Sequence, residues 1–443
     1  MICVFGEDAA LLDSKALTKI QSITLITIIL LAAVSGGAVY VLLSGEKQIL
    51  EPIKIGILTD LDLKPNTMNG AILAAEEINN QGGVLGRHFE IIGEDSDVFS
   101  ENYDPYAINL ALTRLITYHK VDFVIARGGE NILIETAAEH KKILIGTSSP
   151  SEALTQRVID DYEKYKYFFR ISLNETAYTR QLVDSLVHLR EITGLNKVAY
   201  LGAEVKQIKV IKEVLDYSLP EEHGFELVYR GSYPWGETLD FSSYFAAAEA
   251  AGAEIMVPLM ITEEGLIFAK EWYDRQSPMV VWGMNSFISD MTSWNVTEGK
   301  VEHMTGYASS VLELGYQVTS KTVLSQEAYL KRWGELPNQA AIVAYDCIRF
   351  LLYDALQRAQ TTETEAVIKA LEESEIENSL ERNFKFTSSH DHYIGPGNEL
   401  MMMFQWQENE TWAIVYPKQI MEETGATYTF PPWPGPWGNL NSS

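Results

Sequence analysis

The sequence predicts an α/β protein made of two similar lobes, each built on a parallel β-sheet. Apolar, β-branched runs such as PIKIGILTD and VDFVIA have the composition of strands that are buried on both faces. Amphipathic helical segments separate these runs, and strands that alternate with helices favour right-handed βαβ units. The alternation occurs in two successive series along the chain, which predicts the two lobes.

The first series follows a short polar linker, residues 44–51. Its expected strands are PIKIGILTD, HFEII, VDFVIA and KILIG, and its expected helices cover residues 67–79, 105–119 and 132–140. Gly82 and Gly83 end the first helix, because glycine adopts the left-handed conformation of a helix C-cap without strain. The acidic run GEDSD follows HFEII at the carboxyl end of a strand, where open α/β sheets place their ligands. We interpret its acids as solvated loop residues.

The second series begins near Phe168. Its expected helices cover residues 178–193, 206–217 and 240–251, and KVAYLG, FELVYRGSY, EIMVPLM, PMVVWG and HMTGYASS are expected to form a second parallel set of strands. The chain is expected to cross between the lobes near residues 169–172 and again near 307–313. Further helices are expected at residues 324–333, 340–360 and 363–373, followed by the strand-like MMMFQWQ and WAIVYP. The Pro- and Trp-rich end of the chain is expected to be an extended tail.

An uncharged apolar segment at residues 20–43 precedes the two lobes. As a helix it would be about 36 Å long, enough to cross a hydrocarbon core of about 30 Å. Lys15 and Lys19 lie before it, so the positive-inside rule predicts a cytoplasmic segment at residues 1–19 and an external main domain. A cleaved signal peptide is the alternative for this segment. The sequence therefore predicts a single-pass protein of the cell membrane, or an exported one.

The composition excludes several classes of function. With 34 Lys and Arg against 61 Asp and Glu, the net charge is −27, and such a field repels nucleic acids. Cys3 and Cys347 are too few for a disulfide framework or a zinc site. The chain contains no nucleophile elbow and no phosphate-binding glycine motif. We expect neither an enzyme nor a bound cofactor.

The segments IKIGILTD, NGAILAAEEINNQGGVLGRHFEIIGEDSD, ILIGTSSPSEALT, FFRIS and GETLDFSSYF occur in this order along the chain. Together with AAIVAYDCIRFLLYDAL and the terminal hairpin, they resemble the exported solute-binding proteins of branched-chain amino-acid type ABC importers, which include leucine/isoleucine/valine-binding proteins. AAEEINNQGGVLGR is the most specific element. The resemblance covers residues 53–417 and implies a type I periplasmic-binding fold, with two lobes joined by a three-crossing hinge and a ligand held between them.

The resemblance also implies a division of the chain and a function. Residues 52–170 with 314–384 would form the first ligand-binding lobe, residues 171–313 with 385–417 the second, and residues 418–443 the tail. The protein would capture a small polar solute by hinge closure and deliver it to the permease and ATPase subunits of an ABC transporter. The alternative is the ligand-binding ectodomain of a sensory receptor complex, although the sequence has no cytoplasmic signalling domain.

The expected ligand-binding residues of the first lobe follow two strands. Ser149-Pro150-Ser151-Glu152 reads as a capping box with proline at the first helical position. The N–H groups and positive dipole at such a helix start suit a carboxylate, and in resembling proteins this loop holds the ligand's carboxylate. The expected contacts are therefore Thr147, Ser148 and Ser149. Arg127 and Gly128 follow VDFVIA, and the arginine suits bidentate carboxylate binding.

In the second lobe, the matching loops suggest Glu204, Thr262 and Asn285 as ligand-binding residues. Relatives that bind amino acids tend to have an acidic residue where Asn285 stands, to neutralise the ligand's ammonium group. An amide, a urea-like solute or a carboxylate is therefore an alternative to an amino acid, and Glu204 is a candidate for the missing charge. The alternate histidines of His390-Asp391-His392 could share a zinc ion, but no third ligand is evident nearby. We interpret the segment as a hairpin turn.

Overall fold

The computed structural model of the chain describes residues 50–61, 66–96, 104–128, 131–236, 238–261, 263–289, 292–308, 320–377, 379, 383–393 and 401–438. The chain divides into two compact units, Met1–Glu51 and Pro52–Ser443, and almost all described residues belong to the second. The predicted cytoplasmic segment 1–19 and membrane span 20–43 lie outside the described residues. Within the described part, no helix has the length and apolar character needed to cross a membrane.

Five parallel strands form the first sheet, in the order β2-β1-β3-β4-β5. They are β1 (Ile53–Thr59), β2 (Phe89–Asp95), β3 (Phe123–Ala126), β4 (Leu144–Gly146) and β5 (Phe168–Arg170). The register places Leu58 beside both Glu94 and Ala126, so the carboxyl ends of β1, β2 and β3 lie together. The parallel sheet predicted for the first series is confirmed.

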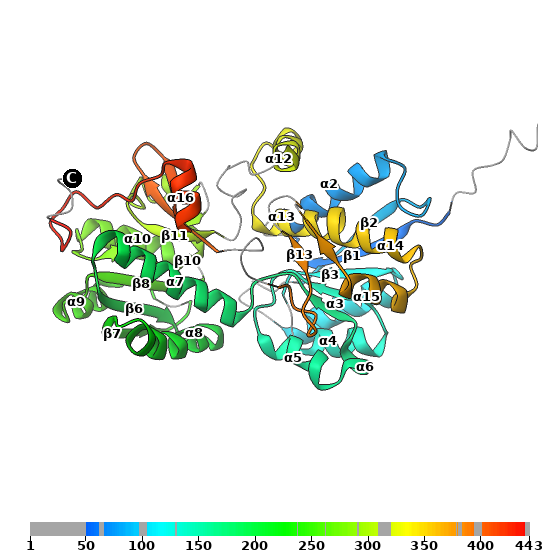
Figure 1. Cartoon of the computed structure of the whole chain (residues 1–443), viewed down its shortest axis with the longest axis horizontal. Helices are drawn as coiled ribbons and strands as arrows, with labels where there is room; N and C mark the ends of the chain where they lie inside the picture. Colours follow the sequence, from blue (N-terminus) through cyan, green and yellow to red (C-terminus); the bar gives the residue numbers. More distant parts are fainter. Residues whose placement is uncertain are drawn as a thin grey trace, which may run out of the picture. The chain divides into compact units, whose positions relative to one another are not determined.

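Helices cover both faces of this sheet (Figure 1). Apolar residues of α2 (Asn66–Asn80), α13 (Gln339–Asp346), the π-helical Cys347–Leu352 and α15 (Thr364–Glu372) form one half of the core with the sheet. The other half comes from α3 (Pro105–Thr117), α4 (Asn131–Glu139) and α5 (Glu152–Asp160). The remaining elements of this part are α6 (Tyr162–Tyr165), α12 (Ser320–Trp333), α14 (Tyr353–Ala359), β12 (Glu375–Ile376) and β13 (Phe384–Lys385).

One close approach fixes how α2 meets α13. A Cβ atom added to Gly70 would lie 2.0 Å from the carbonyl oxygen of Ala341, so only glycine allows these two helices to come so near each other. Residues from positions 66–80 and 339–346 thereby share one core although more than two hundred residues separate them.

The second sheet is also parallel, with the order β10-β8-β6-β7 and β9 beside β8. Its strands are β6 (Lys197–Ala203), β7 (Glu226–Tyr233), β8 (Ile255–Met260), β9 (Val280–Val281) and β10 (Met284–Asn285). The helical elements of this region are α7 (Glu175–Thr193), α8 (Lys206–Tyr217), the π-helical Ser218–Glu222, α9 (Ser242–Ala250), α10 (Glu264–Asp274), the 3₁₀ turn Ser286–Ser289 and α11 (Thr292–Val296). A single apolar core joins the sheet to these helices.

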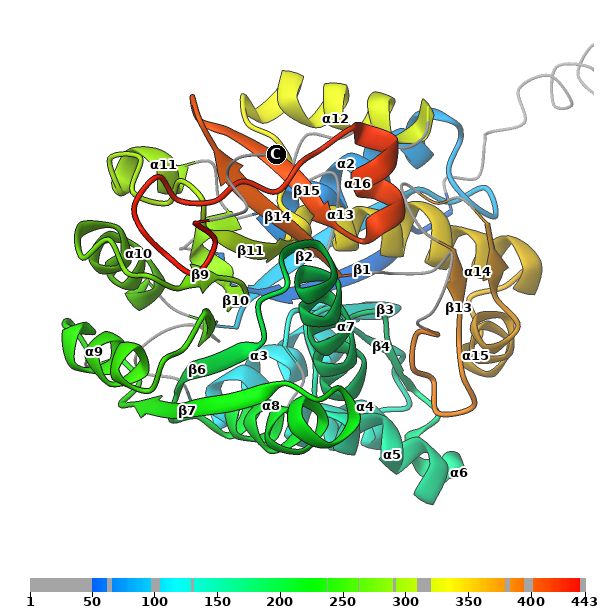
Figure 2. The ribbon, with the colours of Figure 1, turned by 60° about the vertical axis from the view of Figure 1, so that its left-hand side comes forward.

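HMTGYASS differs from the prediction. Its strand, β11 (Thr305–Ala308), makes only a parallel bridge from Thr305 to Trp282 and otherwise pairs antiparallel with β14 (Met402–Gln407). The strand β15 (Thr411–Tyr416) completes this third, antiparallel sheet of order β11-β14-β15 (Figure 2). The prediction of a parallel strand was wrong because β14, which follows β11 by about a hundred positions, supplies the partner edge.

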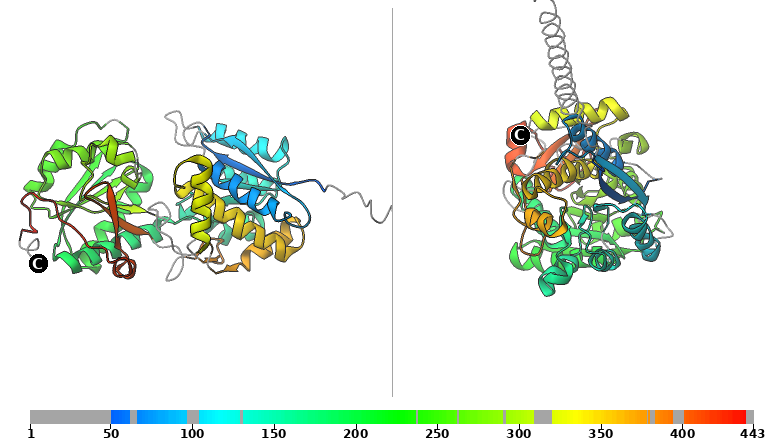
Figure 3. Two further views of the ribbon diagram at one scale, coloured as in Figure 1. Left: turned by 90° about the horizontal axis from the view of Figure 1, so that it is seen from above. Right: turned by 90° about the vertical axis from the view of Figure 1, so that its right-hand side faces the viewer.

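The predicted tail is not simply extended chain. It begins with the helix α16 (Lys418–Thr424), and the segment after it runs beside the second parallel sheet and its helices, in red in Figure 3. Trp433 donates its indole N–H to the carbonyl of Ser277 at 2.8 Å, and Trp437 is fully buried. The backbone of Thr429 exchanges two hydrogen bonds with the side chain of Gln405 in β14, at 2.7 and 2.8 Å. The tail therefore belongs to the second core.

His303, just before β11, gives this region a pH dependence. Burial lowers the pKa of His303 to about 4, from an ordinary value of 6.5. Between these two values the unfolded chain binds a proton that the folded chain does not, so stability should fall as the pH is lowered through this window. In urea unfolding experiments, His303→Asn should lose less stability between pH 7 and pH 4.5 than the wild type does. Asparagine is the chosen replacement because it tolerates the positive φ of 68° at this position. Equal losses in both proteins would contradict this assignment.

Candidate functional site

The candidate site lies at the carboxyl ends of the two parallel sheets, where the strand order reverses. In the first sheet β1 lies between β2 and β3, and in the second sheet β6 lies between β7 and β8. Consecutive connections leave such a strand in opposite directions, and the crevice that opens there is the usual ligand position of an open α/β sheet. Arg127 and Gly128 follow β3, Glu204 follows β6, and Thr262 follows β8 but lies outside the described residues.

Arg127 is the cationic group at this position. Its backbone N–H donates to the carbonyl of Leu58 at 2.8 Å, which holds it beside the end of β1. Burial lowers the pKa of Arg127, while the negative charges of Asp60 and ionised Tyr307 act in the opposite direction. Gly128 has a φ of 97°, a left-handed conformation that turns the chain sharply after β3. Arg127 is thus a partly buried cation within electrostatic reach of Asp60, which follows β1, and of Tyr307 in β11.

Asp60 is a site residue that the sequence analysis did not single out. It follows β1 directly, its side chain is 4% exposed, and it accepts a hydrogen bond from the Ser96 hydroxyl at 3.3 Å. The sequence contained a signal for this residue, because Asp60 is an acidic residue at the carboxyl end of the first predicted strand. Its carboxylate contributes negative charge at the same strand ends as Arg127.

Glu94 and Asp95 of the acidic run form the end of β2, so the prediction that they are solvated loop residues is wrong, and both have structural partners. Glu94 binds Arg114 at 2.6 Å and His119 at 3.1 Å, and the hydrogen bond from Arg114 lowers the pKa of Glu94. Asp95 accepts the backbone N–H of Leu61 at 3.3 Å. These two acids hold β2 to α3 and to the turn after β1, so the structure gives no reason to place them among the ligand contacts.

The loop after β4 contains Thr147, Ser148 and Ser149. Thr147 directs both its backbone N–H and its hydroxyl to the carbonyl of Ala126, at 2.9 and 3.2 Å. The backbone N–H of Ser149 donates to the hydroxyl of Ser172, at 3.2 Å. Thr147 and Ser149 are buried, and Ser148 is partly exposed. The loop is therefore tied to the end of β3 and to the segment that follows β5.

The predicted capping box is wrong. Helix α5 begins at Glu152, and its N-cap is Ser151, whose side chain makes no capping hydrogen bond. Ser149 and Pro150 therefore precede the helix. They lie in a non-helical loop, in which Arg170 binds the carbonyl of Ser149 at 2.8 Å. The Ser149 hydroxyl is buried without a hydrogen-bond partner among the described residues. A Cβ atom added to Gly146 would lie 2.7 Å from this hydroxyl oxygen, so the glycine leaves room for the Ser149 side chain.

Two tyrosines of the second core, Tyr178 and Tyr307, were missed by the sequence analysis, and Tyr307 interacts electrostatically with Arg127. The rings of Tyr178, in the first turns of α7, and Tyr307, in β11, are perpendicular with centroids 5.3 Å apart. The Tyr307 hydroxyl is 3.3 Å from that of Ser286. The Tyr178 hydroxyl is buried without a hydrogen-bond partner within the described chain, and burial raises the pKa of this phenol well above its ordinary value. No local pattern marks either residue, because their proximity depends on the third sheet.

The other residues predicted in the second lobe have different environments. Glu204 is exposed, and its backbone N–H donates to the carbonyl of Tyr233 at 2.9 Å. Asn285 is fully buried: its amide donates to the carbonyl of Gly265 at 2.9 Å and accepts the N–H of Phe287 at 3.3 Å. The carboxamide of Asn285 therefore joins α10 to the turn after β10.

His390, Asp391 and His392 do not gather around a common point. His390 lies within hydrogen-bond distance of the Phe168 carbonyl and of Glu372, at 3.0 and 2.9 Å, and His392 of the Asn383 carbonyl at 3.1 Å. Asp391 binds Arg170. Among the described residues, no group of three or more potential ligands is placed to hold a metal ion.

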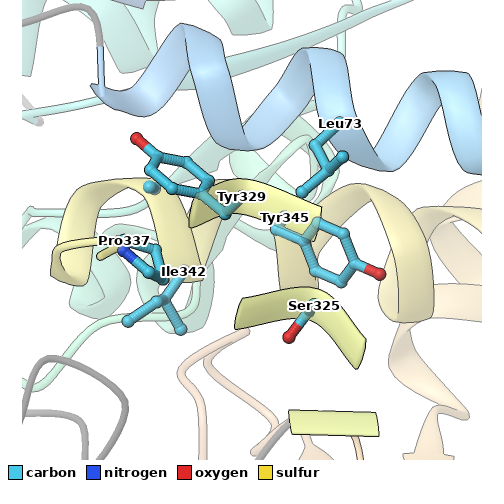
Figure 4. A pocket seen from close by; sticks show the side chains of 7 residues that line it. Leu73, Ser325, Tyr329, Pro337, Ile342 and Tyr345 are labelled. Carbon is cyan, nitrogen blue, oxygen red and sulfur yellow. The ribbon is translucent and has the colours of Figure 1, made fainter. Parts of the chain in front are cut away.

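A small hollow lies elsewhere, between α2, α12 and α13 (Figure 4). Leu73, Ile342 and the rings of Tyr329 and Tyr345 line it. The two tyrosine hydroxyls bind residues of α2, Asn66 at 3.2 Å and Glu77 at 2.5 Å. This hollow is a packing feature between helices and is separate from the strand ends that carry Arg127.

Comparison with known proteins agrees with this architecture. A solved structure of a putative branched-chain amino acid ABC transporter from Silicibacter pomeroyi has a TM-score of 0.75 and 17% identity, covering 86% of this chain and all of that one. A branched-chain amino acid transporter substrate-binding protein from Streptococcus pneumoniae, in complex with isoleucine, has a TM-score of 0.64 and 18% identity over 83% of this chain and 100% of its own. A solute-binding protein from R. palustris in complex with benzoate has a TM-score of 0.64 and 14% identity, over 82% and 95%.

The search of curated proteins found no match. The solved structures share the fold, which confirms the α/β architecture with parallel sheets expected from the sequence. A family model described as periplasmic binding protein matches residues 52–411, which is most of the chain. The chain therefore belongs to the periplasmic binding protein family.

Proposed function

We propose that this protein is an extracytoplasmic solute-binding protein that captures a small polar solute, such as an amino acid, an amide or a related compound, by hinge closure. It delivers the solute to the permease and ATPase subunits of an ABC transporter. Residues 52–170 with 314–384 form one lobe and residues 171–313 with 385–417 the other, and residues 20–43 serve as membrane anchor or signal. The observation that carries the proposal is the position of Arg127: it directly follows β3 of the first sheet, its backbone N–H binds the carbonyl of Leu58 near the end of β1, and it is partly buried.

The charges suggest how the solute is held. Arg127 offers a partly buried guanidinium, and Thr147, Ser148 and Ser149 precede the positive end of α5. Both features favour a carboxylate or carbonyl group on the side of the first sheet. Tyr178 and Tyr307 offer aromatic surface on the other side, with Glu204 and Thr262 at the ends of β6 and β8. We leave Asn285 out of the proposed contacts, because both ends of its carboxamide already bind the backbone.

Hinge closure is tested by small-angle scattering. We expect residues 46–443 to become more compact when a bound solute is added, with a smaller radius of gyration. Native mass spectrometry of protein purified without denaturation identifies a retained solute, and a panel of L-isoleucine, benzoate, acetamide and urea covers the proposed classes. No compaction with any retained solute or panel member would contradict the proposed function.

Arg127→Gln tests the role of the guanidinium. The substitution removes the charge and leaves a shorter, neutral polar side chain, so carboxylate-bearing solutes should lose about 10- to 100-fold in affinity, the range for hydrogen bonds to charged groups. Neutral amides should change much less. The control is Arg114→Gln, since Arg114 lies on α3, binds Glu94 of β2 and has a side chain 45% exposed. Calorimetry that shows equal carboxylate affinities for wild type and Arg127→Gln would exclude Arg127 from the ligand contacts.

A further inference from the structure

We infer that Arg170 and Asp391 form a buried clamp that positions the 147–151 loop for its ligand and ties this loop to two joining segments, residues 171–174 between β5 and α7 and residues 386–393 after β13. The inference rests on the proposed function, because it concerns the same ligand loop. Arg170 is the last residue of β5, and 221 positions separate it from Asp391. In the clamp, Arg170 acts through the loop and not on the solute.

All the N–H groups of the Arg170 guanidinium have acceptors. Nε and Nη2 donate to the two carboxylate oxygens of Asp391, at 2.8 and 2.5 Å. Nη1 donates to the carbonyls of Ser149 and Ser151, at 2.8 and 2.6 Å. Nη2 also donates to the hydroxyl of Thr155, in α5, at 3.1 Å. The side chain of Arg170 is fully buried, so water does not compete for these contacts.

Arg170 of the clamp and the backbone N–H of Glu175 together determine which way the loop's peptide groups face. The carbonyls of Ser149 and Ser151 bind Arg170, and the carbonyl of Pro150 accepts the N–H of Glu175 at 2.9 Å. In a trans peptide, the N–H of the next residue points opposite to the carbonyl. The N–H groups of Ser151 and Glu152 therefore point away from the segment that contains Arg170 and Glu175. They belong to the positive end of α5, so Arg170 orients the Glu152 N–H and Glu175 the Ser151 N–H, both of them donors that suit an anionic ligand group.

Asp391 connects this loop to both joining segments. Besides Arg170, it accepts the amide of Asn174 at 2.9 Å. Asn174 is the N-cap of α7, the first helix of the second series, and its oxygen accepts the N–H of Ala177 at 2.7 Å. The backbone of Arg170 also pairs with His390 and His392, each at 2.9 Å. A movement of either joining segment is thus transmitted to the ligand loop through one ion pair.

A lysine cannot replace Arg170 in this clamp. A guanidinium donates in a planar fork to several acceptors at once, whereas an ammonium is a single point with three donors. In Arg170→Lys the ammonium still pairs with Asp391, but the two loop carbonyls lose their fixed partner. Arg170→Gln loses both functions. The pair of variants therefore separates the structural ion pair from the positioning of the loop.

The test is hydrogen–deuterium exchange on the full chain in detergent, without ligand. In Arg170→Lys, the amides of Ser149, Leu154 and Glu175 should exchange about tenfold faster or more, whereas the amides of the second parallel sheet should stay within about twofold of the wild type. The melting temperature of Arg170→Lys should lie above that of Arg170→Gln, yet loop exchange should be equally fast in both. A merely structural role would instead let lysine restore melting temperature and loop protection together.

The matched control is Arg157→Lys. Arg157 lies in α5, the helix that follows the 147–151 loop, but it binds Glu135 and Tyr165 and has a side chain 30% exposed. Loop amides that exchange at the wild-type rate in folded Arg170→Lys, or that accelerate equally in Arg157→Lys, would overturn the clamp. If Arg170→Gln does not fold, Thr155→Val removes one acceptor of Nη2 with the side-chain shape retained, and it should accelerate the same amides. Failure of the wild type to bind any solute would count against the proposed function alone, because the exchange data need no ligand.

Discussion

Asp391→Ala is expected to lower the free energy of unfolding by about 3–5 kcal/mol, the usual cost of removing one partner from a buried ion pair. The variant leaves the Arg170 guanidinium charged and fully buried, without the carboxylate that accepts two of its hydrogen bonds. It also takes away the acceptor of Asn174, the N-cap of α7. The measurement is urea unfolding followed by tryptophan fluorescence at pH 7.

Asp354→Ala is the matched control. Asp354 binds Arg358 at 2.7 Å within helix α14, with both side chains more than a third exposed. Exposed pairs of this spacing contribute only about 0.3–0.5 kcal/mol, so this variant should unfold almost as the wild type does. Similar losses for Asp354→Ala and Asp391→Ala would show that the Arg170–Asp391 pair is no more important than a surface pair.

Trp433→Ala should destabilise the protein by about 3 kcal/mol, the lower end of the range for a buried tryptophan. The side chain is 6% exposed, and its ring packs 5.1 Å from that of Trp272 and 5.3 Å from that of Tyr273. Its indole N–H binds the carbonyl of Ser277. We place the effect at the lower end because the end of the chain is free to detach from α10 instead of leaving a rigid cavity. Thermal unfolding followed by circular dichroism measures the change.

Trp235 provides the comparison for this experiment. It lies after β7 and is 51% exposed, so Trp235→Ala should change the stability by no more than about 0.5 kcal/mol. If Trp433→Ala were as mild as Trp235→Ala, the segment after α16 would not contribute to the second core.

The sequence predicted the local elements well where periodicity and turn chemistry agree. The helix predicted at 206–217 matches α8 at both ends, and the helix at 67–79 differs from α2 by one residue at each end. The double glycine Gly82-Gly83 has positive φ at both positions, as expected of a chain that leaves a helix. These features depend on neighbours within a few residues, so the sequence specifies them directly.

The candidate site was predicted less completely. The rule that ligands bind at the carboxyl ends of parallel strands led to Arg127 and to the loop after β4. It did not lead to Tyr178 or Tyr307, whose rings meet although the two residues are 129 positions apart in the chain. It also did not reveal that Asn285 is occupied by the backbone of Gly265 and Phe287.

The sequence by itself determined the two series of strands and helices, the parallel sheets and the polar residues at the strand ends. Only the tertiary structure decided that β11 pairs with β14, that Arg170 binds Asp391 and that Ser151 replaces Ser149 as the N-cap of α5. The physical reason is that apolar periodicity and turn preferences act over short stretches of chain. A strand edge or a buried charge instead takes its partner from whichever residue the completed fold brings next to it.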